Sequence, residues 1–154
     1  MIKEFFKIRS LLITLLLLIS FNSTLLAKDI NIETILSDNE SVEDSSESID
    51  VFTSDTPEIF VLWKSNELKG AKKMKAVWIA DDTNNAAPPN YKIKDFTLDI
   101  GEGLVSKTVM SSPGSYLSGT FSLTKPTAGW PLGNYHVEIY VDNELVKSIK
   151  FSIE

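Results

Sequence analysis

The 154-residue sequence contains no cysteine and only one histidine, His136. Without cysteine the chain can form no disulfide and no lipoprotein-type anchor, and the Cys and His sets that hold transition metals are missing. A cysteine nucleophile is excluded, and no G-x-S-x-G motif marks a serine nucleophile. The composition therefore argues against an enzyme, and we expect no cofactor.

Long apolar runs are confined to the first 27 residues. A basic start with Lys3, Lys7 and Arg9 precedes the apolar stretch LLITLLLLI, and STLLA follows, ending at Ala27. This order is typical of a secretory signal peptide, and the apolar run is short for a membrane span of about 20 residues. We expect residues 1–27 to be removed on export to the periplasm or the extracellular space.

Arginine is absent after residue 27, and acids outnumber lysines there. Removing Lys3, Lys7, Arg9 and Glu4 from the totals of 15 basic and 21 acidic residues leaves 12 lysines and 20 acids, a net charge of −8. An acidic exported protein repels nucleic acid, so we do not expect DNA or RNA as a partner.

The negative charge is concentrated in residues 28–57. This segment holds nine acids and one lysine, whereas residues 58–154 hold 11 of each. It is also rich in serine and poor in large apolar side chains, so it has little surface to bury in exchange for its chain entropy. We expect a disordered, flexible acidic leader at 28–57, dispensable for folding, and a single globular domain at 58–154.

The globular part carries short apolar or alternating runs separated by turn residues. These runs are EIFVLWK (58–64), KMKAVWIAD (73–81), KDFTLDI (94–100), LVSKTVM (104–110) and GTFSLT (119–124). Short strands at this spacing predict an all-β sandwich or barrel rather than alternating strands and helices.

The C-terminal part has the clearest pattern. Every second residue from Tyr135 to Val141 is apolar, and the alternation resumes after a turn at Asp142 and Asn143. A period of two predicts a strand with one buried face, and a short Asp-Asn turn joins two such strands as a hairpin. His136 falls on the polar side, where we expect it to be solvated and not catalytic.

The stretch GNYHV resembles the G-x-Y-x-C motif that opens strand F of immunoglobulin-like domains. Gly133 and Tyr135 match the motif, Val137 replaces its cysteine, and Trp78 is similar to the buried tryptophan of strand C. The resemblance is to the small Ig-like β-sandwich domains of bacterial envelope and secreted proteins. It implies an antiparallel sandwich of about seven strands, and a tyrosine hydroxyl bonded to the backbone across a corner. Such domains usually bind and do not catalyse.

The stretch DDTNN from Asp81 to Asn85 has two interpretations. Carboxylate and amide oxygens are calcium ligands, and this cluster directly follows a predicted strand. The cluster lacks the spacing of an EF-hand loop, however, and Asp and Asn are also ordinary turn residues.

A run of lysines also has two interpretations. Five lysines lie within twelve residues: Lys64, Lys69, Lys72, Lys73 and Lys75. On a hairpin they would form a basic patch that attracts anionic lipid by about 1 kcal/mol per lysine, with Leu68 and Met74 inserting at headgroup level. Alternatively, the lysines only keep an edge hairpin soluble.

Trp130 lies in the loop AGWPLG, either as a lid on the core or as an exposed contact for a partner. Together these features predict an exported, non-enzymatic binding module that recognises a protein or an envelope polymer through loops or a sheet edge. Binding of anionic membrane lipid at the lysine run is the alternative.

Overall fold

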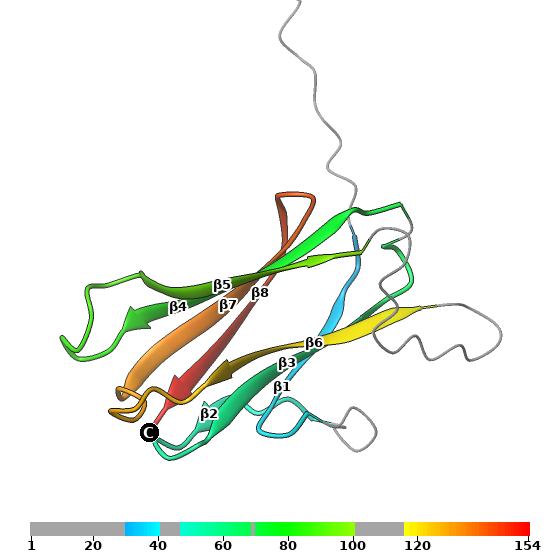
Figure 1. The fold of residues 1–154 in the computed structure, drawn as a ribbon. Coiled ribbons are helices and arrows are strands. Elements are labelled where there is room, and N and C mark those ends of the chain that lie inside the picture. Colours follow the sequence, from blue (N-terminus) through cyan, green and yellow to red (C-terminus); the bar gives the residue numbers. More distant parts are fainter. Residues whose placement is uncertain (1–29, 41–46, 69, 101–115) are drawn as a thin grey trace, which may run out of the picture.

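The computed structural model describes residues 30–40, 47–68, 70–100 and 116–154. Eight strands in these residues form two sheets packed face to face (Figure 1). The three-stranded sheet has the order β1-β3-β6, with β1 at Glu33–Ser37, β3 at Glu58–Ser65 and β6 at Leu117–Thr124. The five-stranded sheet has the order β2-β8-β7-β4-β5, with β2 at Val51–Phe52, β4 at Lys73–Asp82, β5 at Tyr91–Asp99, β7 at Gly133–Val141 and β8 at Glu144–Ile153.

This architecture is an immunoglobulin-like β-sandwich, which confirms the predicted fold class. The strand pairs are antiparallel except for β2 and β8, which run parallel. The predicted runs at 58–64 and 73–81 correspond to β3 and β4, and the last two strands form the predicted hairpin. The predicted signal peptide and the run at 104–110 lie outside the described residues. Within the described part of the chain, no helix is both long and apolar enough to cross a membrane.

The core lies between the two sheets and follows the period of two. On β7 and β4 the buried side chains alternate with outward-facing ones, because successive side chains of a strand point to opposite faces. Trp78 is fully buried at its centre and packs edge-on against Phe151, with ring centroids 6.2 Å apart. Phe151 also stacks on Tyr135 at 5.3 Å, so these aromatic rings join β4, β7 and β8.

The predicted flexible leader is wrong for much of residues 28–57. β1 pairs with β3 over five residues, from Glu33 opposite Lys64 to Ser37 opposite Phe60. Leu36 of β1 is fully buried in the core. The globular domain therefore includes the described residues from 30 onward and does not begin at residue 58.

The second half of this segment is tied to the opposite sheet. Phe52 of β2 is 3% exposed and meets Phe151 edge-on at 5.6 Å between ring centroids. The parallel pairing of β2 with β8 is extended by Ser54, whose N–H donates to the carbonyl oxygen of Glu154 at 3.1 Å. The segment thus supplies an edge strand to each of the two sheets.

The corner before β7 has the geometry that the resemblance implies. Tyr135 is 2% exposed, and its hydroxyl donates to the carbonyl oxygen of Pro131 at 2.5 Å. Gly133 has a φ of +146° and lies directly against the backbone of Asp82, leaving no room for a Cβ. Val137, at the cysteine position of the motif, is fully buried.

Replacing Tyr135 with phenylalanine is expected to lower the free energy of unfolding by about 1–3 kcal/mol, because the carbonyl of Pro131 would lose its buried donor. Urea denaturation followed by tryptophan fluorescence measures this change. Tyr140→Phe is the matched control, since among the described residues that hydroxyl bonds only to Glu138 on the outer face, and its removal should cost within about 0.5 kcal/mol. Equal effects of the two substitutions would contradict the structural role of the corner.

The parent protein and Tyr135→Phe can also be compared at high pH. Burial raises the pKa of the Tyr135 hydroxyl to about 12, from about 10 in an unfolded chain. Between these values the unfolded chain loses the proton that the folded chain keeps, so stability should fall as pH rises from about 10 to about 12. Tyr135→Phe should show a smaller fall over this interval. An unchanged slope would contradict burial of the ionisable hydroxyl.

Candidate functional site

The lysines of the predicted basic hairpin do not lie on a hairpin. β3 carries Lys64 in the three-stranded sheet, whereas β4 carries Lys73 and Lys75 in the five-stranded sheet. Lys72 lies at the end of the connection between the two sheets, and Lys69 lies outside the described residues. The hairpin prediction is wrong because consecutive strands of a sandwich can belong to different sheets.

Three lysines of this run, Lys64, Lys73 and Lys75, also have side-chain partners of their own. Lys64 Nζ lies 3.2 Å from the carboxylate of Glu33, and Lys73 Nζ lies 3.9 Å from that of Asp99. Lys75 Nζ lies over an aromatic ring, 4.5 Å from its centroid. The charges of these three lysines are therefore spread over separate local contacts and do not form one basic patch.

The apolar residues that were expected to enter a bilayer are in the core. Leu68 is 2% exposed and Met74 is fully buried. Neither side chain can insert at headgroup level while the domain is folded. The structure therefore gives no support to lipid binding at this segment.

Trp130 is a lid on the core and not an exposed contact. Its side chain is 4% exposed, and its Nε1 donates to the carbonyl oxygen of Thr56 at 2.7 Å. This bond satisfies the indole N–H, and the Trp130 ring belongs to the hydrophobic core.

The stretch from Asp81 to Asn85 is held by bonds within the protein. Asp81 Oδ1 is hydrogen-bonded to His136 Nδ1 at 2.5 Å, and Asp82 Oδ1 accepts from the N–H of Asn84 at 3.1 Å. Asn84 and Asn85 have positive φ values of 50° and 69°, as turn residues do. Among the described residues, no group of three or more His, Cys, Asp or Glu side chains could hold a metal ion.

A row of polar side chains crosses the outer face of the five-stranded sheet beside this turn. His136 Nε2 lies 3.6 Å from one oxygen of Glu138, and the other oxygen accepts from the hydroxyl of Tyr140 at 2.6 Å. His136 is only 16% exposed and is hydrogen-bonded to Asp81, so it is not freely solvated as predicted. The row joins β4 to β7 through the bond between Asp81 and His136.

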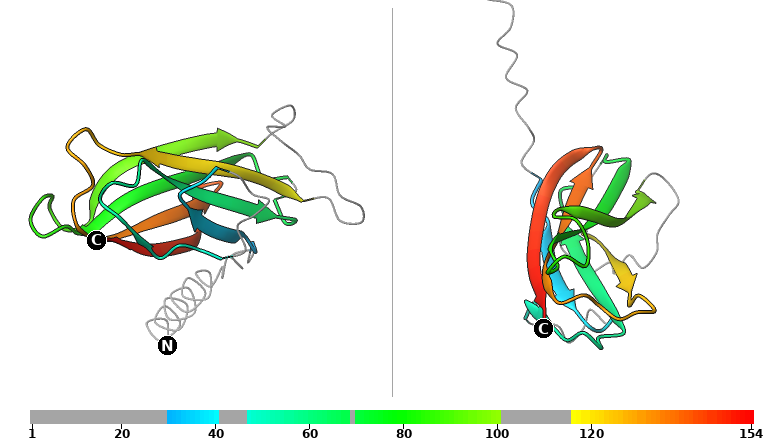
Figure 2. Two further views of the ribbon diagram at one scale, coloured as in Figure 1. Left: turned by 90° about the horizontal axis from the view of Figure 1, so that it is seen from below. Right: turned by 90° about the vertical axis from the view of Figure 1, so that its left-hand side faces the viewer.

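The feature that offers binding capacity is β5. In the described part of the chain, β5 is the last strand of its sheet and pairs only with β4. None of its nine side chains is buried. β5 and β6 lie along the same side of the sandwich, one at the margin of each sheet (Figures 1 and 2). An edge strand presents a row of main-chain N–H and C=O groups that can pair with another chain.

The orientation of these main-chain groups follows from one hydrogen bond. The N–H of Ile100 donates to the carbonyl oxygen of Lys72 at 2.7 Å, so residue 100 faces β4. Because successive residues of an antiparallel strand face opposite neighbours, Asp95, Thr97 and Asp99 present their N–H and C=O groups to the open edge. Three evenly spaced donor and acceptor pairs along β5 therefore face away from β4 and have no strand partner among the described residues.

The inner face of β5 carries apolar side chains beside this edge. Phe96 and Leu98 lie opposite Ala76 and Met74, two residues of the core, but remain only partly buried. Tyr91, at the start of β5, is 50% exposed. An added strand would cover these side chains as well as the main-chain groups.

Sequence reasoning did not select β5. The alternation of Phe96, Leu98 and Ile100 predicts a strand, but its place at the margin of the sheet depends on strand order. The only available signal is composition, because four of its nine residues are charged, as is common on edge strands.

No protein-family model matches the chain, and no curated protein matches it. An immunoglobulin-like protein from Pseudomonas aeruginosa is a structural neighbour, with 11% identity, a TM-score of 0.46, and coverage of 81% of this chain and 94% of that one. A CARDB domain from Pyrococcus furiosus, in complex with di-metal ions, shares 15% identity at a TM-score of 0.39, with coverage of 82% and 90%.

An alkylpurine DNA glycosylase from Pseudomonas fluorescens, bound to DNA containing an abasic site analog, is similar over 82% of this chain. The identity is 13% and the TM-score 0.44, and the match spans only 30% of the glycosylase chain. At TM-scores below 0.5, these similarities carry no argument about function. The topology of the two sheets remains the basis of the fold assignment.

Proposed function

We propose that this chain is an exported, non-enzymatic binding module, which takes up an extended segment of a protein partner as an added strand along β5. The proposal rests on β5, the nine-residue strand at the margin of the five-stranded sheet. None of its side chains is buried, and among the described strands only β4 pairs with it. Export is supported by the signal-peptide pattern of residues 1–27.

Strand addition fits the chemistry of this edge. The open N–H and C=O groups of Asp95, Thr97 and Asp99 need a partner with main-chain amides, which a protein supplies and a simple polysaccharide does not. Main-chain bonds supply affinity in this binding mode, and alternate side chains of the added strand supply specificity. The partly buried Phe96 and Leu98 are placed to contact those alternate side chains.

The rest of the described surface supports binding over catalysis. The single histidine is hydrogen-bonded to Asp81 through Nδ1, and its Nε2 lies 3.6 Å from Glu138, so neither ring nitrogen is directed at a hydroxyl that it could activate. The polar row on the outer face links β4 to β7 through the bond between Asp81 and His136.

A proline substitution tests the proposal. Thr97→Pro removes an N–H that faces the open edge, and proline is tolerated at such positions because no bond to β4 is lost. The probe is a labelled nine-residue peptide, Thr-Val-Thr-Val-Thr-Glu-Thr-Val-Thr, together with its variant carrying Lys in place of Glu, each followed by fluorescence anisotropy. We expect the substitution to weaken peptide binding about tenfold.

Ser122→Pro on β6 is the matched control. The N–H of Lys125 donates to the carbonyl oxygen of Pro57 at 2.8 Å, so by the same alternation Ser122 faces away from β3. This variant places proline on β6, the strand at the margin of the three-stranded sheet, on the same side of the sandwich as β5. It should bind the peptides like the parent protein. Failure of the parent to bind either peptide at millimolar concentration, or equal binding by Thr97→Pro, would contradict the proposal. Thermal melts of both variants establish that they are folded.

A further inference from the structure

The strand β5 contains one irregularity, a bulge opposite Trp78 and Ile79. Lys92 lies opposite Ile79 and Lys94 lies opposite Trp78, so Ile93 is an extra residue in the ladder. The bulge resets the alternation along β5, so that Phe96 and Leu98 share the inner face with Tyr91. Without the extra residue, Phe96 and Leu98 would point to the outer face.

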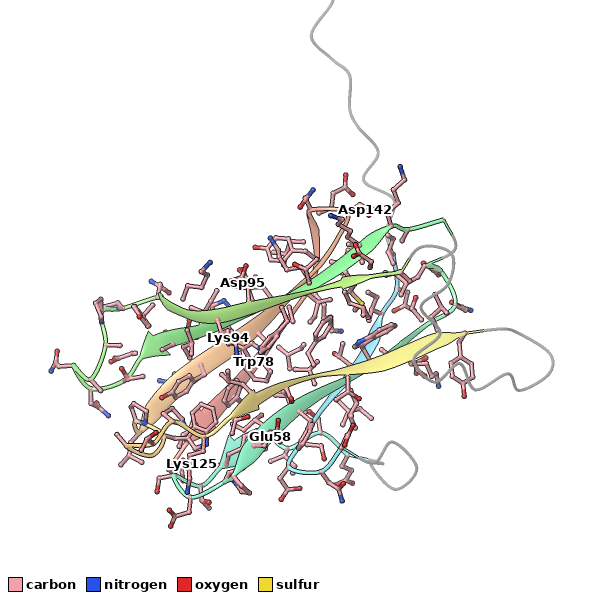
Figure 3. All side chains as sticks on the ribbon, in the orientation of Figure 1. Glu58, Trp78, Lys94, Asp95, Lys125 and Asp142 are labelled. Carbon is pink, nitrogen blue, oxygen red and sulfur yellow. The ribbon has the colours of Figure 1, made fainter. Side chains whose placement is uncertain are left out.

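The bulge also places a positive charge on the inner face. Lys94 lies directly opposite the buried Trp78 of β4, so its side chain is on the same face of the sheet. Figure 3 shows Lys94 and Asp95 on opposite sides of β5. Lys94 Nζ lies 4.6 Å from the ring centroid of Phe96. The ammonium group is thus held beside the apolar side chains that an added strand would cover.

The charges on the outer face of β5 are already paired. Lys92 Nζ lies 3.2 Å from Asp95, and Asp99 lies 3.9 Å from Lys73. By contrast, within the described residues no carboxylate lies within 4.0 Å of Lys94 Nζ. Among the described residues, the β5 edge therefore has one positive charge without an ion-pair partner, the Lys94 ammonium group, beside its apolar side chains.

We infer that Lys94 selects the partner: the β5 edge takes an antiparallel segment that places apolar side chains opposite Leu98 and Phe96 and an acidic side chain opposite Lys94. This inference rests on the proposed function and names the chemistry of the partner. In the direction of the added strand the pattern is apolar, any, apolar, any, acidic. An apolar side chain opposite Lys94 is disfavoured because it would cover an ammonium group without a counter-charge.

The same arrangement disfavours a second copy of this chain as the partner. If two β5 strands paired antiparallel about Phe96, each Lys94 would face the Leu98 of the other copy. Inward-facing charges on an edge strand hinder such self-pairing. The unmatched cation therefore distinguishes an acidic partner from another copy of the domain.

A charge exchange tests the inference with the two peptides already described. The parent protein should bind the Glu peptide about fivefold more tightly than the Lys peptide at low salt. Lys94→Glu should reverse this order, so that the Lys peptide binds more tightly. In the control variant Lys92→Glu, whose altered side chain lies on the outer face, the Glu peptide should remain preferred.

The outcomes separate the two claims. Equal binding of both peptides by the parent, or an unchanged preference in Lys94→Glu, overturns the inference while the strand-addition proposal stands. Binding of neither peptide overturns the proposed function, and the inference with it. Loss of the preference at 1 M salt, where the Debye length is only about 3 Å, supports a charge contact at Lys94.

Discussion

A chain that begins at residue 58 is expected to lose its cooperative unfolding transition, although the segment it lacks has the composition of a disordered leader. The deletion removes Leu36 and Phe52 from the core, together with the edge strands β1 and β2. Losing two large buried side chains costs several kcal/mol in total, at about 2–5 kcal/mol each, against a total stability of about 5–15 kcal/mol for a domain. Differential scanning calorimetry of the shortened and the full domain measures the effect.

Two single substitutions refine this test without shortening the chain. Leu36→Ala should lower the free energy of unfolding by about 2–5 kcal/mol, because its side chain is fully buried. Its neighbour Ile35 faces the other side of β1 and is only partly buried, so Ile35→Ala should cost less. A shortened chain that melts at the same temperature as the full domain would mean that β1 and β2 contribute nothing to stability.

Replacing Gly133 with alanine is expected to be the most damaging single change in the domain. At a φ of +146° an L-residue is strained, and a Cβ here would overlap the carbonyl oxygen of Asp82 and approach Thr83 Cα to 2.8 Å. Because both neighbours are backbone atoms at the β4–β7 pairing, relief requires the two strands to separate. We expect a loss above about 3 kcal/mol or failure to fold, measured by urea denaturation.

Gly70→Ala provides the matched control for Gly133→Ala. Gly70 also has a positive φ, +86°, but a Cβ added there would have open space within 4 Å. The control isolates conformational strain from steric overlap and should cost about 1–2 kcal/mol. Similar losses for the two glycines would contradict the close approach of the corner to β4.

The last two strands were predictable because one local rule decides them. The alternation from Tyr135 to Val141 predicts a strand with one buried face, whatever its neighbours are. Asp142 and Asn143 adopt the left-handed turn conformation, with φ values of 49° and 74°. The corner motif indicated the immunoglobulin-like fold, because Gly133 and Tyr135 form the corner that precedes a strand in such domains.

The N-terminal strands could not be predicted from composition alone. Nine acids and many serines predict disorder when averaged over residues 28–57, yet a strand needs only a few apolar residues at the right spacing. Ile30, Ile32 and Leu36 fall on one parity, and Ile32 and Leu36 are buried at 3% and 0% exposure. That alternation was the signal for a strand, and the charge of the surrounding residues obscured it.

The functional site depends on sheet order, which a single sequence does not determine. The lysine run suggested a basic hairpin because its members are close in the sequence, but the strands at its two ends belong to different sheets. β5 has an ordinary strand pattern, and only its place at the margin of the sheet gives it binding capacity. The role inferred for Lys94 depends further on a bulge of one residue, which no local pattern in this sequence marks.

Amide hydrogen exchange along β5, followed by NMR with and without the Glu peptide, tests the central claim most directly. In the free domain the amides of Asp95, Thr97 and Asp99 should exchange quickly, while those of Phe96 and Leu98, which face β4, should exchange slowly. Adding the peptide should slow the first three and leave the other two nearly unchanged. Unchanged exchange at Asp95, Thr97 and Asp99 when the peptide is bound would contradict strand addition at this edge.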